Sequence, residues 1–250
     1  MSVLLNITTQ YNSVLLARAA LYRLAARCLV DPMHSPFAKA ADVEAAVAAA
    51  RFLGEPELAS AAAQVGLSLP VKTAEVREGY LRIFGMVASG AVAPYEVEYE
   101  AKTNVFFRTQ QLADIAGFYR SFALDAVPGE RSDHISIEAE FLQYLLERKI
   151  AARQLGHGRE KVSLLDDVFL KFFREHFGRW ATSFARGLYA LAQERGNDRF
   201  YTAAATFLEL LTNAEARRLK LPEPALRVSN VVDLSSEAEA SCDNGCCEVK

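Results

Sequence analysis

Apolar residues recur at steps of three, four and seven along residues 11–30, and this spacing predicts an amphipathic helix. That helix should end at Asp31, because Pro32 disfavours helical backbone in the residue before it. Similar patterns and propensities predict further helices over 36–52, 56–65, a segment that opens at Thr73, 109–124, 133–154 and 198–212. Thr109 is the expected cap of the helix over 109–124.

The longest apolar stripe runs from Leu165 to Leu191 and predicts one long helix or two helices joined near Gly178. Two stretches, the uncharged Gly85–Pro94 and Asp125–Ser132, contain the glycines and prolines typical of loops. No segment alternates apolar and polar residues with a period of two. The sequence therefore predicts an all-α fold, a single-domain helical bundle of roughly eight to ten helices.

Residues 233–250 differ from the rest, because they contain five acids and one lysine, a net charge of −4 against −3 for the whole chain. Few large apolar residues remain there, so we expect a flexible acidic tail after a helical domain over 1–232. Within that domain, the loop at 125–132 is a candidate hinge. Two copies could exchange helices through it, so a homodimer stays open.

The overall composition excludes several classes of protein. Apolar residues make up 51% and charged residues 24%, which is too apolar for a disordered chain. A net charge of −3 argues against binding of nucleic acid. No uncharged stretch reaches the length of about 18 residues that a membrane span needs. The N-terminus lacks the basic and apolar regions of a secretory signal, so we expect a cytoplasmic protein.

The sequence lacks the motifs that are typical of several large enzyme classes. There is no glycine-rich phosphate loop, no His-Glu-x-x-His zinc motif, no paired Glu-x-x-His motif and no Gly-x-Ser-x-Gly elbow. These absences do not exclude an enzyme, but no catalytic constellation is evident, and our leading prediction is a protein with no enzyme activity and no bound cofactor. Cys242, Cys246 and Cys247 form a weak candidate for a soft metal, because a tetrahedral site needs a fourth ligand. A reactive or disulfide-forming tail, or no role, is the favoured interpretation.

One region holds a high density of specific motifs, and their order along the chain is informative. The motifs are Tyr80–Phe84, Pro94–Tyr99, Gln111–Tyr119, Phe122–Leu124, Glu130–His134 and Ile137–Phe141, flanked by Arg18–Ala25 with Asp31-Pro32 and by His176–Trp180 with Phe184. Together they resemble the TorD/DmsD/NarJ family of redox-enzyme maturation chaperones. The resemblance covers about residues 12–212.

The resemblance implies an all-α cytoplasmic chaperone for the catalytic subunit of a molybdopterin-dependent oxidoreductase. Such a chaperone binds the twin-arginine signal peptide or the N-terminus of its client. It holds the client until the molybdenum cofactor is inserted, before export or assembly. A signal peptide combines two arginines with an apolar stretch, so its receptor needs carboxylates beside an apolar groove.

The resemblance also singles out Asp133 and His134, which match an Asp-His pair of the family. Asp133 alternatively caps the helix that begins there. Glu138 borders the apolar face of this helix and is either paired internally, for example with Arg131, or available to a client arginine. Glu130 and Arg131 are candidates as well, although a solvated loop pair would explain them.

Tyr95, Glu96, Glu98 and Tyr99 interleave aromatic rings and carboxylates, which suits a client with arginines and apolar side chains. An ordinary helix start with acids in its first turn is the alternative. The candidate set is completed by Asp114 and Tyr119, whereas Leu112, Ile115, Phe118, His176 and Trp180 are expected in the core.

Two other functions remain open at this stage. One is an all-α enzyme, metal-dependent or acting on a small molecule, that uses Asp133, His134 and Glu138, because His134 and Glu138 lie one helical turn apart. The other is a scaffold that binds a different partner helix. The sequence leaves open which oxidoreductase is the client and whether a nucleotide binds.

Overall fold

The computed structural model describes residues 2–33, 35–85, 92–100, 104–126 and 130–222, with the backbone alone for residues 2–9. The predicted acidic tail at 233–250 and its three cysteines lie outside these residues. So do parts of the two predicted loops, namely 86–91 and the centre of the candidate hinge at 127–129.

The described chain is helical from end to end. Its elements are α1 (Ser2–Leu29), α2 (Ala40–Phe52), α3 (Pro56–Leu67), α4 (Thr73–Phe84), the 3-10 helix η1 (Glu96–Tyr99), α5 (Val105–Arg120), α6 (Ile135–Gln154), α7 (Arg159–Glu175), α8 (Phe177–Glu194) and α9 (Arg199–Arg218). In these residues the only extended pairing is an isolated antiparallel bridge between Tyr95 and His134. The predicted all-α bundle is confirmed.

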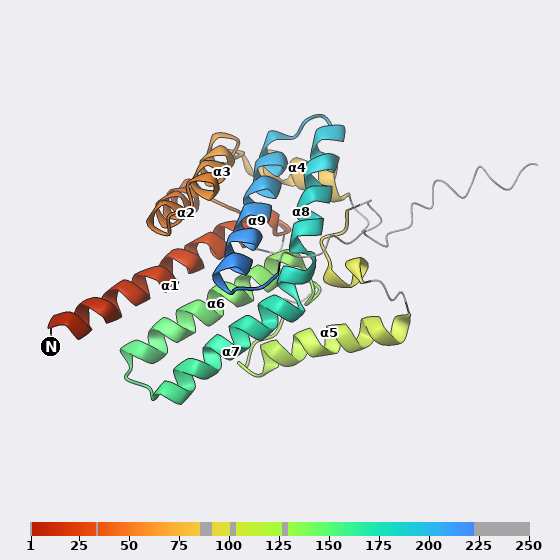
Figure 1. Cartoon of the computed structure of the whole chain (residues 1–250). Helices are drawn as coiled ribbons and strands as arrows, with labels where there is room; N and C mark the ends of the chain where they lie inside the picture. The colour runs from red at the N-terminus through yellow and green to blue at the C-terminus, as the bar shows by residue number, and fades with distance from the viewer. Residues whose placement is uncertain (1, 34, 86–91, 101–103, 127–129, 223–250) are drawn as a thin grey trace, which may run out of the picture.

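Helix α1 is the centre of the arrangement, because it packs against α2, α6 and α9. Helices α6 and α7 form one antiparallel pair, and α8 and α9 form a second pair that crosses the first (Figure 1). Helices α2 and α3 cover the other side of α1 and α9. Helix α5 lies at the outer edge of the bundle (Figure 1), where it contacts η1 and packs Phe118 and Tyr119 on Phe172 of α7.

Aromatic side chains fill the core between these layers. Trp180 is 1% exposed, and Tyr22, Phe172, Phe184 and Phe207 are fully buried. The prediction that Trp180 and His176 belong to the core is confirmed, since His176 is also buried. Of the three residues of α5 expected in the core, Ile115 is buried and Phe118 packs against the core, whereas Leu112 is only partly buried.

Several predicted helix boundaries are wrong. Helix α1 begins at Ser2, well before residue 11, and α2 begins at Ala40, where Lys39 is still extended. Helix α5 begins at Val105 and ends at Arg120, so it is shifted toward the N-terminus. Its cap is Asn104, whose side-chain oxygen accepts a hydrogen bond from the backbone N–H of Phe106 at 2.9 Å. Thr109 lies inside the helix and donates to the carbonyl of Val105.

The long apolar stripe forms two helices, α7 and α8, that join at His176. The backbone of His176, with φ −122° and ψ −98°, interrupts the helical path. Gly178 follows in the first turn of α8. A Cβ at Gly178 would lie 2.7 Å from both the carbonyl oxygen and a ring carbon of Phe173, so only glycine fits this close approach. The predicted joint near Gly178 is therefore confirmed, with the break two residues earlier.

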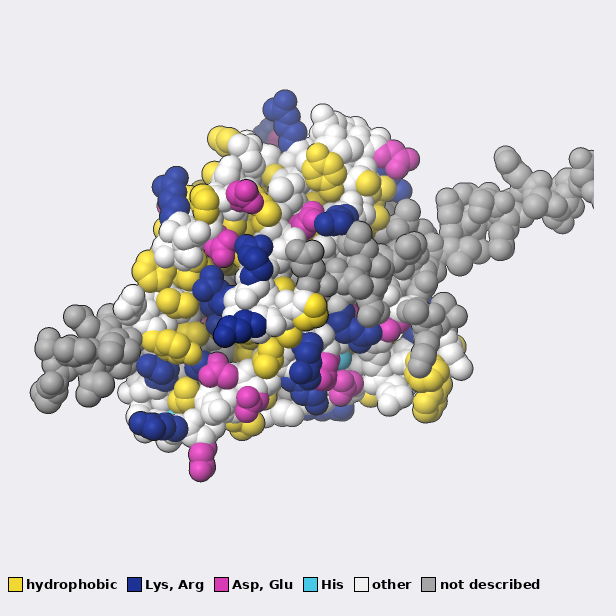
Figure 2. All heavy atoms as spheres, in the orientation of Figure 1, with side chains coloured by type: hydrophobic (Ala, Val, Ile, Leu, Met, Phe, Trp, Pro, Cys, Tyr) yellow, Lys and Arg dark blue, Asp and Glu magenta, His cyan; other side chains and the backbone are white. Residues whose placement is uncertain are grey.

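The surface carries Lys and Arg side chains interspersed with Asp and Glu on the face shown in Figure 2. Three hydrophobic side chains in the first turn of α5 are solvent-exposed: Val105 is 76% exposed, Phe106 69% and Phe107 41%. None of the helices in the described ranges has the length and apolar character needed to cross a lipid bilayer.

Candidate functional site

The segment Pro94–Tyr99 lies beside the segment Glu130–His134, and both contain predicted site residues. The backbone N–H of Glu96 donates to the carbonyl of Asp133 at 3.0 Å, and the N–H of Ile135 donates to the carbonyl of Pro94 at 2.9 Å. These hydrogen bonds flank the bridge between Tyr95 and His134. The short helix η1 is thus attached to the N-terminal end of α6.

Asp133 is fully buried and is bound by its own chain. Its carboxylate accepts hydrogen bonds from Arg131, at 2.9 and 2.8 Å, and from the backbone N–H of Val97 at 3.3 Å. The suggested pairing of Arg131 with Glu138 is therefore wrong. Glu130 accepts a hydrogen bond from the backbone N–H of Arg131 at 3.3 Å, while the guanidinium of Arg131 binds Asp133. The guanidinium of Arg131 also lies 4.0 Å from the centre of the Tyr95 ring.

His134, and not Asp133, caps α6. Its Nδ1 accepts a hydrogen bond from the backbone N–H of Ser136 at 3.2 Å and lies 2.8 Å from the Ser136 hydroxyl. Burial, assisted by the nearby charge of Arg131, lowers the pKa of His134 to about 3. His134 is therefore neutral near pH 7 and acts as a hydrogen-bonding cap. The interpretation of Asp133 as the cap is wrong.

Beneath this layer, two acids lie in the interior. Glu96 is 1% exposed; its carboxylate accepts a hydrogen bond from Gln111 at 2.6 Å and lies 3.1 Å from Nδ1 of His176. Glu138 is fully buried and accepts a hydrogen bond from the indole N–H of Trp180 at 3.1 Å. Burial raises the pKa of Glu138 well above its usual value, and the neighbouring carboxylate of Glu96 raises it further. Both effects favour the protonated form of Glu138.

The other predicted site residues surround this interior. Glu98 accepts a hydrogen bond from Arg108 at 2.5 Å and lies 3.6 Å from Arg131. The side chain of Asp114 is 57% exposed, with its carboxylate 3.2 Å from Nε2 of His176. Tyr99 is buried against Trp180, with ring centres 5.2 Å apart.

Tyr119 is buried too, and its hydroxyl donates to the carbonyl of Ser132 at 2.9 Å. Most of the predicted set thus forms an internal network that holds η1 against α6 and α8. Direct contact between a client and the carboxylates of Glu96, Asp133 or Glu138 would need these internal partners to be displaced.

The three residues of the enzyme hypothesis do not converge on one point. Asp133 binds Arg131, His134 binds Ser136 and Glu138 binds Trp180. In the described part of the chain, no group of three or more His, Cys, Asp or Glu side chains could hold a metal ion. The geometry therefore gives no support to a metal centre at these residues.

A groove of about 350 Å³ opens next to this network, between α1, α6 and the segment that follows α5. Its wall on α6 is one helical face that carries Ile137, Glu140, Phe141 and Tyr144. The lining residues are Arg23, Ala26, Arg27, Tyr119, Leu124, Asp125, Ala126, Ile137, Glu140, Phe141, Gln143, Tyr144 and Glu147. Of the predicted site residues, Tyr119 alone is part of this lining.

Glu140 is the distinctive charge of the groove. It forms no hydrogen bond or ion pair with any described residue, although it is partly buried. Burial raises its pKa, and the nearby charge of Arg27 opposes that shift. The cations of the α1 wall already have acidic partners, because Arg23 binds Glu147 at 2.8 Å and Arg27 binds Asp42 at 2.6 Å.

The groove therefore presents the Glu140 carboxylate beside apolar side chains, and both arginines of its α1 wall are paired with other acids. Sequence analysis missed Glu140. The signal that could have identified it is its spacing, since an acid at position 140 interrupts the apolar face formed by Ile137, Phe141 and Tyr144.

A family model described as "Nitrate reductase delta subunit" matches residues 45–186, which is more than half of the chain. The match includes α6 with its groove residues, η1 and the buried network around Glu96 and Glu138. No curated protein and no solved structure matches the chain.

Proposed function

Because the chain belongs to the nitrate reductase delta subunit family, a NarJ/TorD-type family of molybdoenzyme maturation chaperones, we propose that it is a chaperone for one such enzyme. Its client is the catalytic subunit of a molybdopterin-dependent oxidoreductase. The chaperone binds the N-terminal segment of that subunit, a twin-arginine signal peptide or its equivalent. It releases the client for export or assembly after the cofactor has been inserted, and it works in the cytoplasm without catalysis of its own.

The observation that carries the proposal is the groove between α1 and α6. A peptide with arginines beside an apolar stretch requires a carboxylate next to apolar surface. Glu140 supplies the carboxylate, and Leu124, Phe141 and Tyr144 supply apolar surface. Since Glu140 is partly desolvated and forms no ion pair with a described residue, a client guanidinium would relieve an existing electrostatic cost.

The residues predicted from the sequence have a supporting role in this proposal. Their network holds the N-terminal end of α6, from which Ile137 and Glu140 project into the groove. Tyr119 connects the network to the groove, because it lines the groove and donates a hydrogen bond to Ser132 in the turn before α6. Glu98 and Asp114, on the outer side of the network, are the remaining candidates for a second arginine of the client.

Replacing Glu140 with glutamine should weaken binding of the client peptide by about tenfold to a hundredfold, since a charge-assisted hydrogen bond contributes roughly 1.5–3 kcal/mol. The measurement is calorimetric titration with the N-terminal peptide of the host's molybdoenzyme subunit, in its natural form and with each arginine replaced by alanine. In a double-mutant cycle, the loss of affinity caused by Glu140→Gln should be non-additive with the loss caused by replacing one arginine of the peptide.

Glu160→Gln on α7 is the matched control, because Glu160 is exposed and lies outside the groove. This control should change the affinity less than twofold. If Glu140→Gln and Glu160→Gln bind the natural peptide equally well, the assignment of the groove is wrong. If the folded wild-type chain binds neither the peptide nor the subunit, the chaperone assignment itself fails.

A further inference from the structure

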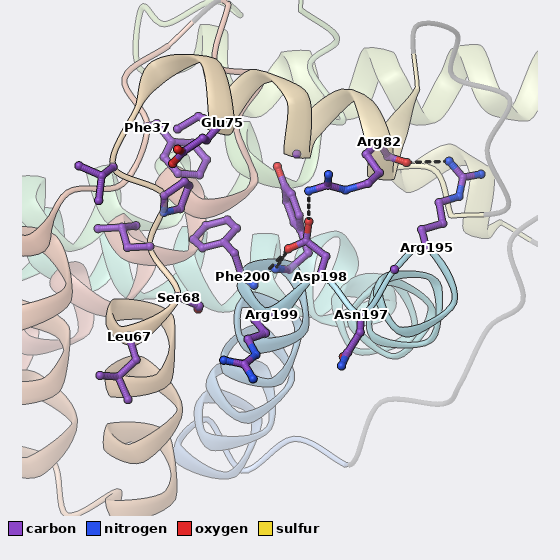
Figure 3. A pocket seen from close by; sticks show the side chains of 17 residues that line it. Phe37, Leu67, Ser68, Glu75, Arg82, Arg195, Asn197, Asp198, Arg199 and Phe200 are labelled. Atoms are coloured by element: carbon purple, nitrogen blue, oxygen red, sulfur yellow. Dashed lines mark hydrogen bonds and ion pairs between the residues drawn. The ribbon is translucent and has the colours of Figure 1, made fainter.

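Another hollow of the described surface shares no lining residue with the proposed client groove. It measures about 540 Å³ and lies between α4, the end of α3 and the turn from α8 to α9 (Figure 3). A second hollow of about 460 Å³ continues from it along the first two turns of α9. Leu67, Ser68, Asn197 and Arg199 line both hollows, so the two form one groove.

Positive charge in this groove is only partly neutralised by its own acids. Arg82 pairs with Asp198 at 2.8 Å, as the dashed line in Figure 3 shows. Arg195 has no acidic partner among the described residues and donates to the carbonyl of Arg82 at 2.8 Å. Arg199 makes no hydrogen bond or ion pair with any described residue, and it points away from the Arg82–Asp198 pair (Figure 3). The guanidinium of Arg199 therefore remains available to an anionic partner, and that of Arg195 carries a charge that no described acid neutralises.

Several apolar side chains along the same groove are also exposed to solvent. Leu67, the last residue of α3, is 81% exposed; Val71, between α3 and α4, is 93% exposed, and Tyr189 of α8 is 46% exposed. The groove is open and elongated, in contrast to a closed pocket for a small molecule. It suits an extended, acidic stretch of polypeptide that also carries small apolar residues.

The chain itself contains such a stretch in residues 233–250, with five acids and one lysine. The described chain ends at Pro222, beyond the C-terminal end of α9. The groove lies at the other end of this helix, about 30 Å away for 20 residues of α-helix. Eleven residue-to-residue steps lead from Pro222 to Asp233, and in an extended chain they reach about 36 Å. Asp233 and the acids that follow it can therefore return to Arg199.

We propose that residues 233–250 dock into the groove formed by the end of α3, the start of α4 and the start of α9, with their carboxylates on Arg199 and Arg195. The proposal is independent of client binding between α1 and α6. The ion pairs are exposed, so they are sensitive to salt and add little to the stability of the fold. Because the segment belongs to the same chain, its effective concentration at the groove is high. It would exclude other acidic partners from this surface.

Disulfide trapping in the full-length chain tests the proposal, because the tail carries Cys242, Cys246 and Cys247, while Cys28 is free but buried. Leu67→Cys places a thiol in the groove, and Leu164→Cys on α7, also exposed, is the control. With oxidised glutathione as the oxidant, we expect Leu67→Cys to form an intramolecular disulfide with a tail cysteine at least fivefold faster than Leu164→Cys. Peptide mass mapping identifies the bond.

The charge dependence separates docking from random collision. Adding Arg199→Glu to Leu67→Cys should slow trapping to the rate of the control, and so should high salt. Glutamate at the first position of α9 is compatible with the helix, so the fold should be unaffected, as circular dichroism can verify. The proposal is overturned if Leu67→Cys and Leu164→Cys react at the same rate, if Arg199→Glu has no effect, or if the disulfide joins two copies of the chain.

Discussion

Trp180→Ala should lower the free energy of unfolding by about 3–5 kcal/mol, as expected for the truncation of a buried tryptophan. Trp180 is 1% exposed and packs on Tyr99 and Phe184, with ring centres 5.2 and 5.6 Å away. The substitution leaves a cavity between η1 and α8. It also removes the indole N–H that donates to Glu138, so a buried acid loses its partner.

Denaturant unfolding followed by far-ultraviolet circular dichroism is the measurement, because Trp180 is the chain's one tryptophan and its fluorescence disappears in the variant. Trp180→Phe is the matched control, since it fills most of the volume but cannot donate to Glu138. Trp180→Phe should lower the free energy of unfolding by less than Trp180→Ala does. A loss below about 1 kcal/mol for Trp180→Ala would contradict the described packing, because such small effects are typical of surface positions.

Glu215→Ala should destabilise the fold by about 3–5 kcal/mol, because it leaves the charge of Arg18 buried without a counterion. Arg18 of α1 and Glu215 of α9 form two hydrogen bonds, of 3.1 and 2.7 Å, and their side chains are only 11% and 2% exposed. The pair ties the first helix to the last. The guanidinium also lies 4.6 Å from the centre of the Phe169 ring, so little water can reach it.

A double variant distinguishes two causes of destabilisation. One is a buried charge left without its counterion, and the other is the loss of the favourable energy of the ion pair. Arg18→Met combined with Glu215→Leu replaces the pair by apolar side chains of similar length, and it should be more stable than Glu215→Ala alone. The measurement is again the midpoint and slope of denaturant unfolding. A double variant that is as unstable as the sum of both single variants would contradict this account, because additivity means that the two side chains are not energetically coupled.

The fold could be predicted well where long amphipathic segments face the core. Residues 165–191 contain enough aromatic residues at helical spacing to place α7 and α8 from the sequence. Helix α5 was misplaced because its first turn carries Val105 and Phe106, which are exposed and therefore do not follow the periodicity of a core-facing helix. Local propensity also placed the cap at Thr109, although Asn104 has the better position to accept from a free N–H.

The candidate site was predicted less completely, because a sequence does not show which carboxylates are buried against each other. Glu96 and Glu138 are 42 positions apart, and only the fold brings both to the vicinity of Trp180 and His176. An acid that is paired inside the protein and an acid that is available to bind a client occur in the same sequence pattern. Glu140 was missed for the converse reason, since an acid between apolar residues of a helix is usually a solvated edge.

The central claim is that this chain recognises an immature molybdoenzyme subunit through its N-terminal segment. Calorimetric titration of the full chain with the host's catalytic subunit tests it most directly, with the subunit in three forms: without cofactor, with cofactor inserted, and without cofactor and N-terminal segment. Tight binding is expected for the first form, and binding at least tenfold weaker for the other two. Equal affinity for all three forms, or no binding to the cofactor-free subunit by folded chain, would contradict the claim.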